Sequence, residues 1–531
     1  MSFEVLLLVL ASVTAVSGLA RRFGVPPPFL LVVGGLAVSY VPGVPEVSLD
    51  PHLVLVLVLP PLLYAAALST AYADFGDNLR PIGLLSVGLV LVTTFAVAGI
   101  ATLVVPALPI AAAIALGAIV APPDAIAATA VARRMALPRR VLVILEGESL
   151  LNDATALVSY RIAVSAAVVG GATVGGALGD FAVAAIGGSA IGLLLGVVLA
   201  ALRRRLHDPL LENAVSLLTP FAAFLPAEKA HASGVLAVVV TGLYLGRRAP
   251  VLLSSGARLQ GQALWAMVTF FLEGLVFALI GLQLPQVVDA LGDDAAVAIE
   301  TAAAVTATVV LVRFAWVFPA TYLPRWLSRR LRSRDPAPPW RYPFLIGWAG
   351  MRGVVSLAAA FALPTDMPGR DLILFVTFCV IIATLLVQGM TLPWLVRRLD
   401  LDDDGEAERI EKAVATADHH VARMALQELE RMDADMPPSV SDELRHHLEE
   451  RVRHAHAVLG GCPGEDEYDD GATPEDRHAL ADAVTTVQVR RQLLDVERSE
   501  LLRLYRARDI DDEVLRALQQ QLDVEELGLA G

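Results

Sequence analysis

Residues 142–169 read LVILEGESLLNDATALVSYRIAVSAAVV, and this stretch decides the fold class. It is long enough to cross a bilayer, because a membrane helix takes about 20 mostly apolar residues. Its first half nevertheless carries a polar patch, formed by Glu148, Ser149, Asn152 and Asp153. At i, i+4 spacing these side chains share one face of a helix. A charge at the bilayer centre costs about 2.5–3.5 kcal/mol on insertion scales, so the patch predicts a functional site rather than a polar seam between helices.

The whole chain has the composition of a membrane protein. Of its 531 residues, 56% are hydrophobic and only 18% are charged, whereas soluble domains carry about 45–50% apolar and about 25% charged residues. We therefore expect an all-α polytopic protein with thirteen membrane spans. The predicted spans lie near residues 3–20, 28–41, 52–73, 81–105, 108–131, 142–169, 178–202, 209–226, 231–246, 262–284, 293–323, 342–363 and 371–396.

The loops between these spans alternate in charge. Every second loop, starting with the one that holds Arg21 and Arg22, carries arginines, and these total nineteen. The opposite loops carry only Lys229 and Arg370. Lys and Arg near span ends favour the cytoplasm. We therefore expect a multi-pass protein of the plasma membrane, with its N-terminus outside and its C-terminal tail in the cytoplasm.

The tail is a separate, acidic part of the chain. Residues 400–531 hold 34 acids and 15 bases, a balance of -19, whereas residues 1–399 have a balance of +5. This predicts a transmembrane domain over 1–399 and a helical cytoplasmic domain over 400–531. The sign of the charge argues against nucleic-acid binding, and no Gly-x-x-x-x-Gly-Lys-Ser/Thr motif for ATP is present. Seven of the ten histidines lie in the tail, where they are pH sensors, metal ligands or simply surface residues.

Two predicted spans are interrupted in mid-membrane. The fifth contains Pro122-Pro123-Asp124, and the twelfth reads GWAGMRGVVS over 347–356 with Arg352 inside it. Proline removes backbone donors and breaks a helix. The breaks are seven spans apart, so they occupy matching places in two inverted six-span repeats, which is a pointer to a transporter's midplane site.

Other charges within the spans also need partners. We expect Arg352 to pair with Glu148, which is the most plausible acidic partner within the spans. Glu273 in the tenth span, Arg313 in the eleventh and Arg161 in the sixth are interpreted mainly as structural ion pairs.

These motifs together resemble those of the monovalent cation:proton antiporters, with the closest similarity to NhaP-like bacterial sodium/proton exchangers. The residues that carry the resemblance are Pro-Pro-Asp at 122–124, Glu-Gly-Glu-Ser-Leu-Leu-Asn-Asp at 146–153, Gly-Met-Arg-Gly at 350–353, Phe-Leu-Glu-Gly-Leu-Val-Phe at 271–277 and Leu-Pro-Pro-Leu-Leu-Tyr at 59–64. The resemblance covers about residues 1–399. It implies a thirteen-span antiporter in which a core domain moves against a dimerisation domain, working as a homodimer in the lipid membrane.

The resemblance also implies roles for individual residues. Asp153 resembles the essential ion- and proton-binding aspartate. Asn152 precedes it, and in the family an Asn-Asp pair goes with electroneutral exchange. Asp124 matches the aspartate at the broken helix. The remaining matches are Ser149 as a hydroxyl ligand, and Glu148, Asn152 and Arg352 as a polar cluster that braces the site.

This chain departs from the family pattern at two places. Pro123-Asp124-Ala125 stands where the family often has Thr-Asp-Pro, so that only the Pro123 carbonyl can serve as a ligand there. Many members also have an acid in the third span, where this chain has Leu63-Tyr64-Ala65-Ala66. The second departure removes a potential ligand or proton gate.

The expected activity is secondary antiport without a cofactor and without enzymatic chemistry. Na⁺, or alternatively K⁺ or Li⁺, competes with a proton for Asp153, with alternating access, in pH and sodium homeostasis. Two alternatives stay open. A cation channel would follow voltage, and an intramembrane aspartyl protease could use Asp124 and Asp153 as its pair of acids but would not need Asn152.

Overall fold

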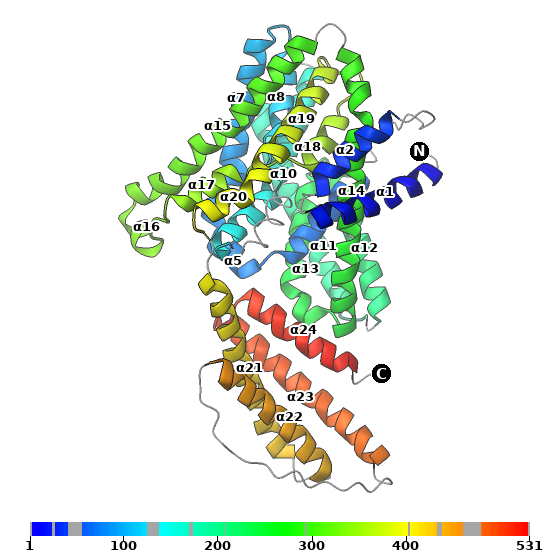
Figure 1. Ribbon diagram of the computed structural model, residues 1–531, viewed down its shortest axis with the longest axis vertical. Helices are drawn as coiled ribbons and strands as arrows, with labels where there is room; N and C mark the ends of the chain where they lie inside the picture. The colour runs from blue at the N-terminus through cyan, green and yellow to red at the C-terminus, as the bar shows by residue number, and fades with distance from the viewer. Residues whose placement is uncertain are drawn as a thin grey trace. The chain divides into compact units, whose positions relative to one another are not determined.

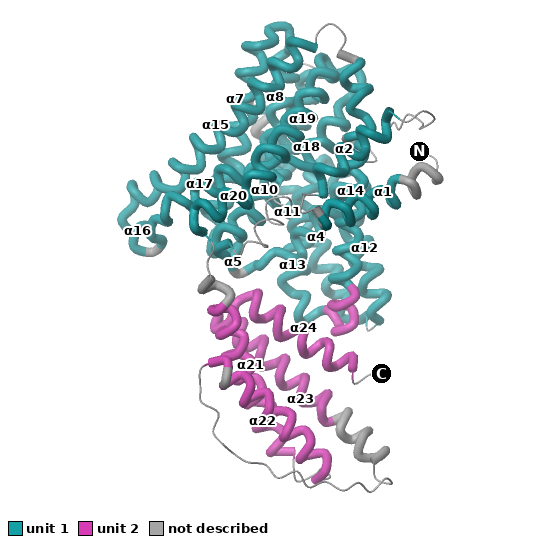
Figure 2. Tube along the Cα trace, in the orientation of Figure 1, with its two compact units in different colours: residues 1–252, 261–402 teal, residues 253–260, 403–531 magenta. Residues whose placement is uncertain are grey.

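The computed structural model describes residues 3–23, 27–40, 56–124, 137–168, 174–206, 208–291, 295–401, 404–432, 438–459 and 479–528. Every regular element within these ranges is helical (Figure 1). The chain forms two compact units (Figure 2). Unit 1 comprises residues 1–252 and 261–402, and unit 2 comprises residues 253–260 and 403–531.

The first half of unit 1 follows the predicted spans closely. Its helices are α1 (Phe3–Phe23), α2 (Pro27–Ser39), α4 (Leu59–Ser69), α5 (Tyr72–Asp77), α6 (Leu79–Gly83), the π-helix η1 (Leu84–Leu89), α7 (Val90–Val104), α8 (Ile110–Val120) and α10 (Arg139–Val168). Because α6, η1 and α7 run on continuously, they form the predicted fourth span, over Leu79–Val104. The second half of the predicted fifth span lies outside the described residues.

The second half of unit 1 matches the remaining spans. Its helices are α11 (Val174–Arg203), α12 (Pro209–Lys229), α13 (Gly234–Leu252), α14 (Ser255–Leu291), α15 (Ala295–Leu327), α16 (Arg329–Arg334), α17 (Arg341–Trp348), α18 (Val354–Phe361), α19 (Arg370–Thr384), η3 (Leu385–Gly389) and α20 (Met390–Arg398). Among the described residues, seven helical segments are long and apolar enough to cross a membrane. The others are short or, like α10, interrupted by polar residues.

The two interrupted spans meet at their breaks. Helix α8 ends at Val120, before the two prolines, and the chain is not helical between α17 and α18. The backbone N–H of Asp124 donates to the carbonyl of Met351 over 2.6 Å. A Cβ atom at Gly353 would lie 1.7 Å from Oδ2 of Asp124, so the close approach of the two segments requires glycine there. The matched breaks therefore form one crossing point.

Small residues also bring α8 against α7. A Cβ at Gly117 would lie 2.2 Å from the carbonyl oxygen of Thr94 on α7. Small residues at helix contacts in membranes let the backbones approach closely and gain dispersion energy. This contact fixes the end of α8 that leads into the break.

Unit 2 is built from four tail helices, α21 (Asp404–Met432), α22 (Pro438–Val458), α23 (Ala479–Ala507) and α24 (Asp512–Gly528). Leucines of α23 and α24, including Leu494 and Leu518, form one of its apolar cores. Buried ion pairs add to it: Arg451 lies 2.8 Å from Glu497 and 2.6 Å from Asp418. A charged chain can bury such groups only where each has its partner.

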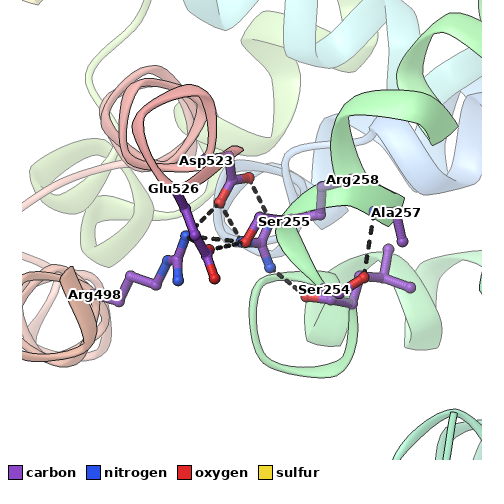
Figure 3. A network of polar contacts seen from close by, with 8 residues as sticks. Ser254, Ser255, Ala257, Arg258, Arg498, Asp523 and Glu526 are labelled. Carbon is purple, nitrogen blue, oxygen red and sulfur yellow. Dashed lines mark hydrogen bonds and ion pairs between the residues drawn. The ribbon is translucent and has the colours of Figure 1, made fainter. Parts of the chain in front are cut away.

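The first turns of α14 belong to unit 2 rather than to the membrane unit. Arg258 donates from Nε to Oδ2 of Asp523 over 2.7 Å. Arg498 donates to Oδ1 of Asp523 and to the hydroxyl of Ser255, in each case over 3.0 Å (Figure 3). Residues at the start of α14 thus pack with the acidic residues of the tail.

Candidate functional site

The polar patch of α10 is buried in the middle of that helix. Asn152 is fully buried, and Glu148 and Asp153 are 1% and 5% exposed. Ser149 is half-buried, on the face of α10 that it shares with Asp153 one turn later. Four oxygen-bearing side chains that the sequence placed on one helical face therefore point into the protein.

Asn152 ties this patch to the first break. Its Nδ2 donates to the carbonyl of Pro123 over 2.9 Å. Its Oδ1 is buried and accepts no hydrogen bond from any group in the described part of the chain. Buried acceptors in proteins normally have a partner. An acceptor left over beside Asp153 is available to a cation or a water molecule.

Asp124 is the second carboxylate at this place. Its backbone is fixed by the hydrogen bond to Met351, and its side chain lies over Gly353. Its charge acts on that of Asp153. Two carboxylates that repel each other share a proton or a cation more readily than they both remain bare.

The expected pairing of Arg352 with Glu148 is wrong. Glu148 instead makes a bidentate ion pair with Arg313, at 2.5 Å and 2.9 Å. Arg352 donates to the carbonyls of Val120 and Ala121, over 3.0 Å and 3.3 Å. The physical reason is that the helix ends here: the N–H of Asp124, which would bond the carbonyl of Val120 in a continuing helix, donates to Met351 instead and leaves the last carbonyls of α8 without backbone donors. A guanidinium has five donors and can satisfy several of them.

The two buried arginines act alike at the two breaks. While Arg352 binds the last carbonyls of α8, Arg313 donates from Nε to the carbonyl of Ile346, near the end of α17, over 3.0 Å. The backbone N–H of Arg352 in turn donates to the hydroxyl of Thr384 over 3.1 Å. Arg313 and Thr384 thus brace the site. Sequence reasoning did not assign either of them to it, although an arginine in mid-span was a signal for Arg313.

The two other charges of the spans behave differently from each other. Arg161 pairs with Glu228 over 2.7 Å, as expected of a structural ion pair. The same interpretation of Glu273 is wrong, because this side chain makes no ion pair or hydrogen bond with any described residue. The charge that acts on Glu273 is Asp124, another acid.

The sequence and the fold can be compared with known proteins. A family model described as "sodium/hydrogen exchanger, transmembrane" matches residues 7–398. A protein of Mycobacterium tuberculosis named "uncharacterized Na⁺/H⁺ exchanger" is 38% identical over 538 residues, which is 99% of this chain and 96% of that protein. The sodium, potassium, lithium and rubidium/H⁺ antiporter of Bacillus subtilis is 33% identical over 417 residues, covering 74% of this chain and 62% of that one.

A solved structure supports the architecture independently. The sodium proton antiporter MjNhaP1 from Methanocaldococcus jannaschii superposes with a TM-score of 0.56 at 19% sequence identity, over 75% of this chain and 98% of that chain. At this identity the likeness concerns the fold alone, which is that of an all-α polytopic membrane antiporter. Together with the family model, which spans about three quarters of the sequence, these findings show that the chain belongs to the sodium/hydrogen exchanger family.

Proposed function

We propose that the protein exchanges a monovalent cation for protons, with Asp153 as the group that binds the two in turn. One observation carries this proposal: a buried acid lies beside an unused acceptor, Oδ1 of Asn152, where two broken spans cross. Broken helices in transporters place backbone ends and polar side chains around ions near the membrane midplane. The family and the names of the relatives agree with cation:proton antiport.

The proposed ligands are all oxygen atoms. The carboxylates of Asp153 and Asp124, the hydroxyl of Ser149, Oδ1 of Asn152 and the carbonyl of Pro123 would replace the hydration shell of Na⁺, or of K⁺ or Li⁺. Asn152 already holds the Pro123 carbonyl, but a carbonyl has two lone pairs and one remains for a cation. Hard cations prefer such oxygen ligands.

Exchange follows from competition for one buried charge. A carboxylate in the protein interior is costly unless a proton or a cation compensates it. The carrier therefore changes sides only when Asp153 is loaded, and a cation carried one way is followed by a proton carried the other way. The opposing ion gradient supplies the free energy. Alternating access of this kind requires no cofactor or ATP.

The ion pair and the buried arginines have a different task. Glu148 with Arg313, and Arg352 with the carbonyls of Val120 and Ala121, hold the broken helices without binding the transported ion. Rigid neighbours keep the ligands at the distances that the ion requires. We assign these residues to positioning.

Four further parts of the proposal come from the sequence. The Asn152-Asp153 type of the family implies electroneutral one-for-one exchange, and the family implies a homodimer. The arginine bias of the loops places the N-terminus outside and the tail in the cytoplasm. The activity would serve pH and sodium homeostasis at the plasma membrane. A channel or an intramembrane protease is not favoured, because the relatives are named as exchangers and antiporters.

Proteoliposomes test the proposal. Purified protein is reconstituted with an inside-acidic pH gradient, and Na⁺, K⁺ or Li⁺ is added outside while an internal dye reports pH. We expect saturable collapse of the gradient by at least one of these cations, at a rate that a clamped membrane voltage does not change. A voltage-driven, non-saturating flux would show a channel instead.

A further inference from the structure

The end of α15 and the loop after it present a surface that the exchange mechanism does not use. We call it the Trp–Arg surface, formed by Trp326, Leu327, Arg329, Arg330, Arg332 and Trp340. Trp326, Leu327 and Trp340 are 72%, 70% and 55% exposed. The three arginines, all on α16, are exposed too. Two exposed tryptophans, at the two ends of a segment over 326–340 that carries three exposed arginines, are an unusual combination for the surface of a soluble protein.

A half-buried ionic hub holds this surface in place. The carboxylate of Asp335 accepts hydrogen bonds from Arg80, Arg140 and Arg325, over 3.0 Å, 2.8 Å and 2.7 Å. Burial would raise the pKa of Asp335, but the hydrogen bonds from Arg140 and Arg325 outweigh it and hold that pKa below its usual value. Asp335 therefore stays ionised, and it fastens the end of α16 to α6, α10 and α15.

Three arginines of α16 have no acidic partner among the residues that the structure describes. Arg329, Arg330 and Arg332 make no ion pair within the described ranges of the chain. Arg332 donates to the backbone carbonyls of Arg325 and Trp326, over 3.2 Å and 3.1 Å, which leaves its charge uncompensated. Since Asp335 is already shared by three other arginines, the hub has no negative charge to spare.

The length of α15 indicates the depth of the surface. Arg313 on α15 lies at the crossing of the broken helices, which in transporters is near the bilayer midplane. Trp326 follows 13 residues later in the same helix, which is about 20 Å along its axis. Half of the hydrocarbon core measures only about 15 Å. Trp326 and the arginines after it therefore lie at the level of the lipid headgroups.

We propose that the Trp–Arg surface is a binding site for anionic phospholipid headgroups. Tryptophan is enriched at this level of a bilayer because one end of its ring system is apolar and the other polar. The planar guanidinium binds phosphate oxygens in pairs, and uncompensated arginines at the membrane surface attract anionic lipids. The class of ligand follows from the exposed tryptophans and the uncompensated arginines, and it does not depend on which ion the protein exchanges.

Lipid retention by the full-length protein tests this site. The purified protein is titrated in detergent with phosphatidylglycerol or phosphatidylcholine, and bound lipids are counted by native mass spectrometry. We expect a preference for phosphatidylglycerol that Arg329→Gln with Arg330→Gln lowers about thirtyfold. The matched control is Arg204→Gln with Arg205→Gln, which removes two exposed arginines from another loop and leaves the preference unchanged.

A second pair of changes separates the aromatic from the ionic part. Trp326→Ala with Trp340→Ala should weaken binding of both lipids while keeping the preference for the anionic one. Equal retention of the two lipids by the unchanged protein would overturn the proposal. So would undiminished binding of phosphatidylglycerol by the Arg329 and Arg330 variant, or an equal loss in the control.

Discussion

Arg313 and Glu148 form a doubly hydrogen-bonded ion pair that joins α15 to the centre of α10. Both side chains are 1% exposed, and the two contacts measure 2.5 Å and 2.9 Å. Through Nε the same guanidinium also holds the carbonyl of Ile346, near the end of α17. One arginine thus connects the helix that carries Asp153 with the second broken span.

Breaking this pair should destabilise the protein strongly. Glu148→Gln leaves the charge of Arg313 buried without compensation, and loss of one partner of a buried pair costs about 3–5 kcal/mol. Arg161→Gln is the matched control. The side chains of Arg161 and Glu228 are 42% and 28% exposed, and an ion pair this exposed contributes about 1 kcal/mol or less to stability. Thermal unfolding in detergent compares the two, and equal midpoints would contradict the importance of the buried pair.

Asn152→Ala should weaken cation binding without unfolding the protein. The change removes both the free acceptor Oδ1 and the hydrogen bond that holds the Pro123 carbonyl. A hydrogen bond is worth about 0.5–1.5 kcal/mol, so we expect the KM for the cation to rise up to about tenfold. Ser159→Ala, which removes a hydroxyl bonded only to its own helix, is the control. An unchanged KM would remove Asn152 from the site.

Glu273→Gln should raise the KM for the cation without lowering the stability of the protein, unlike Glu148→Gln. Glu273 has no cationic partner among the described residues, so its neutralisation should leave the unfolding temperature unchanged or raised. The charge of Asp124 acts on Glu273, so Glu273 lies within electrostatic range of the proposed cation site. Where Glu273 is ionised, the change removes a negative charge there and weakens cation binding. We expect a KM increase of a few fold in proteoliposomes. A fall in unfolding temperature as large as that of Glu148→Gln would reveal a hidden ion pair.

The tail should lose stability on mild acidification through His419. Burial lowers the pKa of this imidazole, and the positive charges of Arg423, His456 and His420 lower it further, against the opposing effect of Asp418. The folded tail therefore prefers neutral His419. The stability that this group contributes is complete above its unfolded pKa of 6.5 and is lost as the pH falls from there through the lower folded pKa. Hydrogen exchange of the α21 amides at pH 7.5 and pH 5.5 measures this.

The matched variant for this measurement is His419→Gln, which cannot take up a proton. It should show less acid-dependent loosening of α21 than the unchanged protein, once the intrinsic exchange rates are corrected for pH. The same loosening in both proteins would assign the effect to other groups of the tail.

The membrane helices could be predicted from the sequence because their signals are local. Hydropathy indicates each span, and the arginine bias of alternate loops is the basis for expecting thirteen of them. The crossing of the two breaks was also predictable, because Pro122-Pro123 and the glycines around Arg352 are seven spans apart. The hydrogen bond between Asp124 and Met351 confirms that these segments meet.

The partners of the buried charges could not be predicted in the same way. Glu148 could pair with either Arg313 or Arg352, because the spacing of residues along one helix does not show which other helix packs against it. Arg352 was expected to pair with an acid, but the unpaired carbonyls at the end of α8 gave it enough acceptors. The start of α14 likewise joins unit 2 through Arg258 and Asp523, a contact between residues 265 positions apart that no local pattern could indicate.

The most direct test of the central claim is cation-dependent proton flux through Asp153→Asn in proteoliposomes. Asparagine keeps the size of the side chain but cannot be charged or take up a proton, so we predict a folded protein that collapses no pH gradient on addition of Na⁺, K⁺ or Li⁺. A variant that exchanges any of these cations at the rate of the unchanged protein would show that the shared carboxylate is not Asp153.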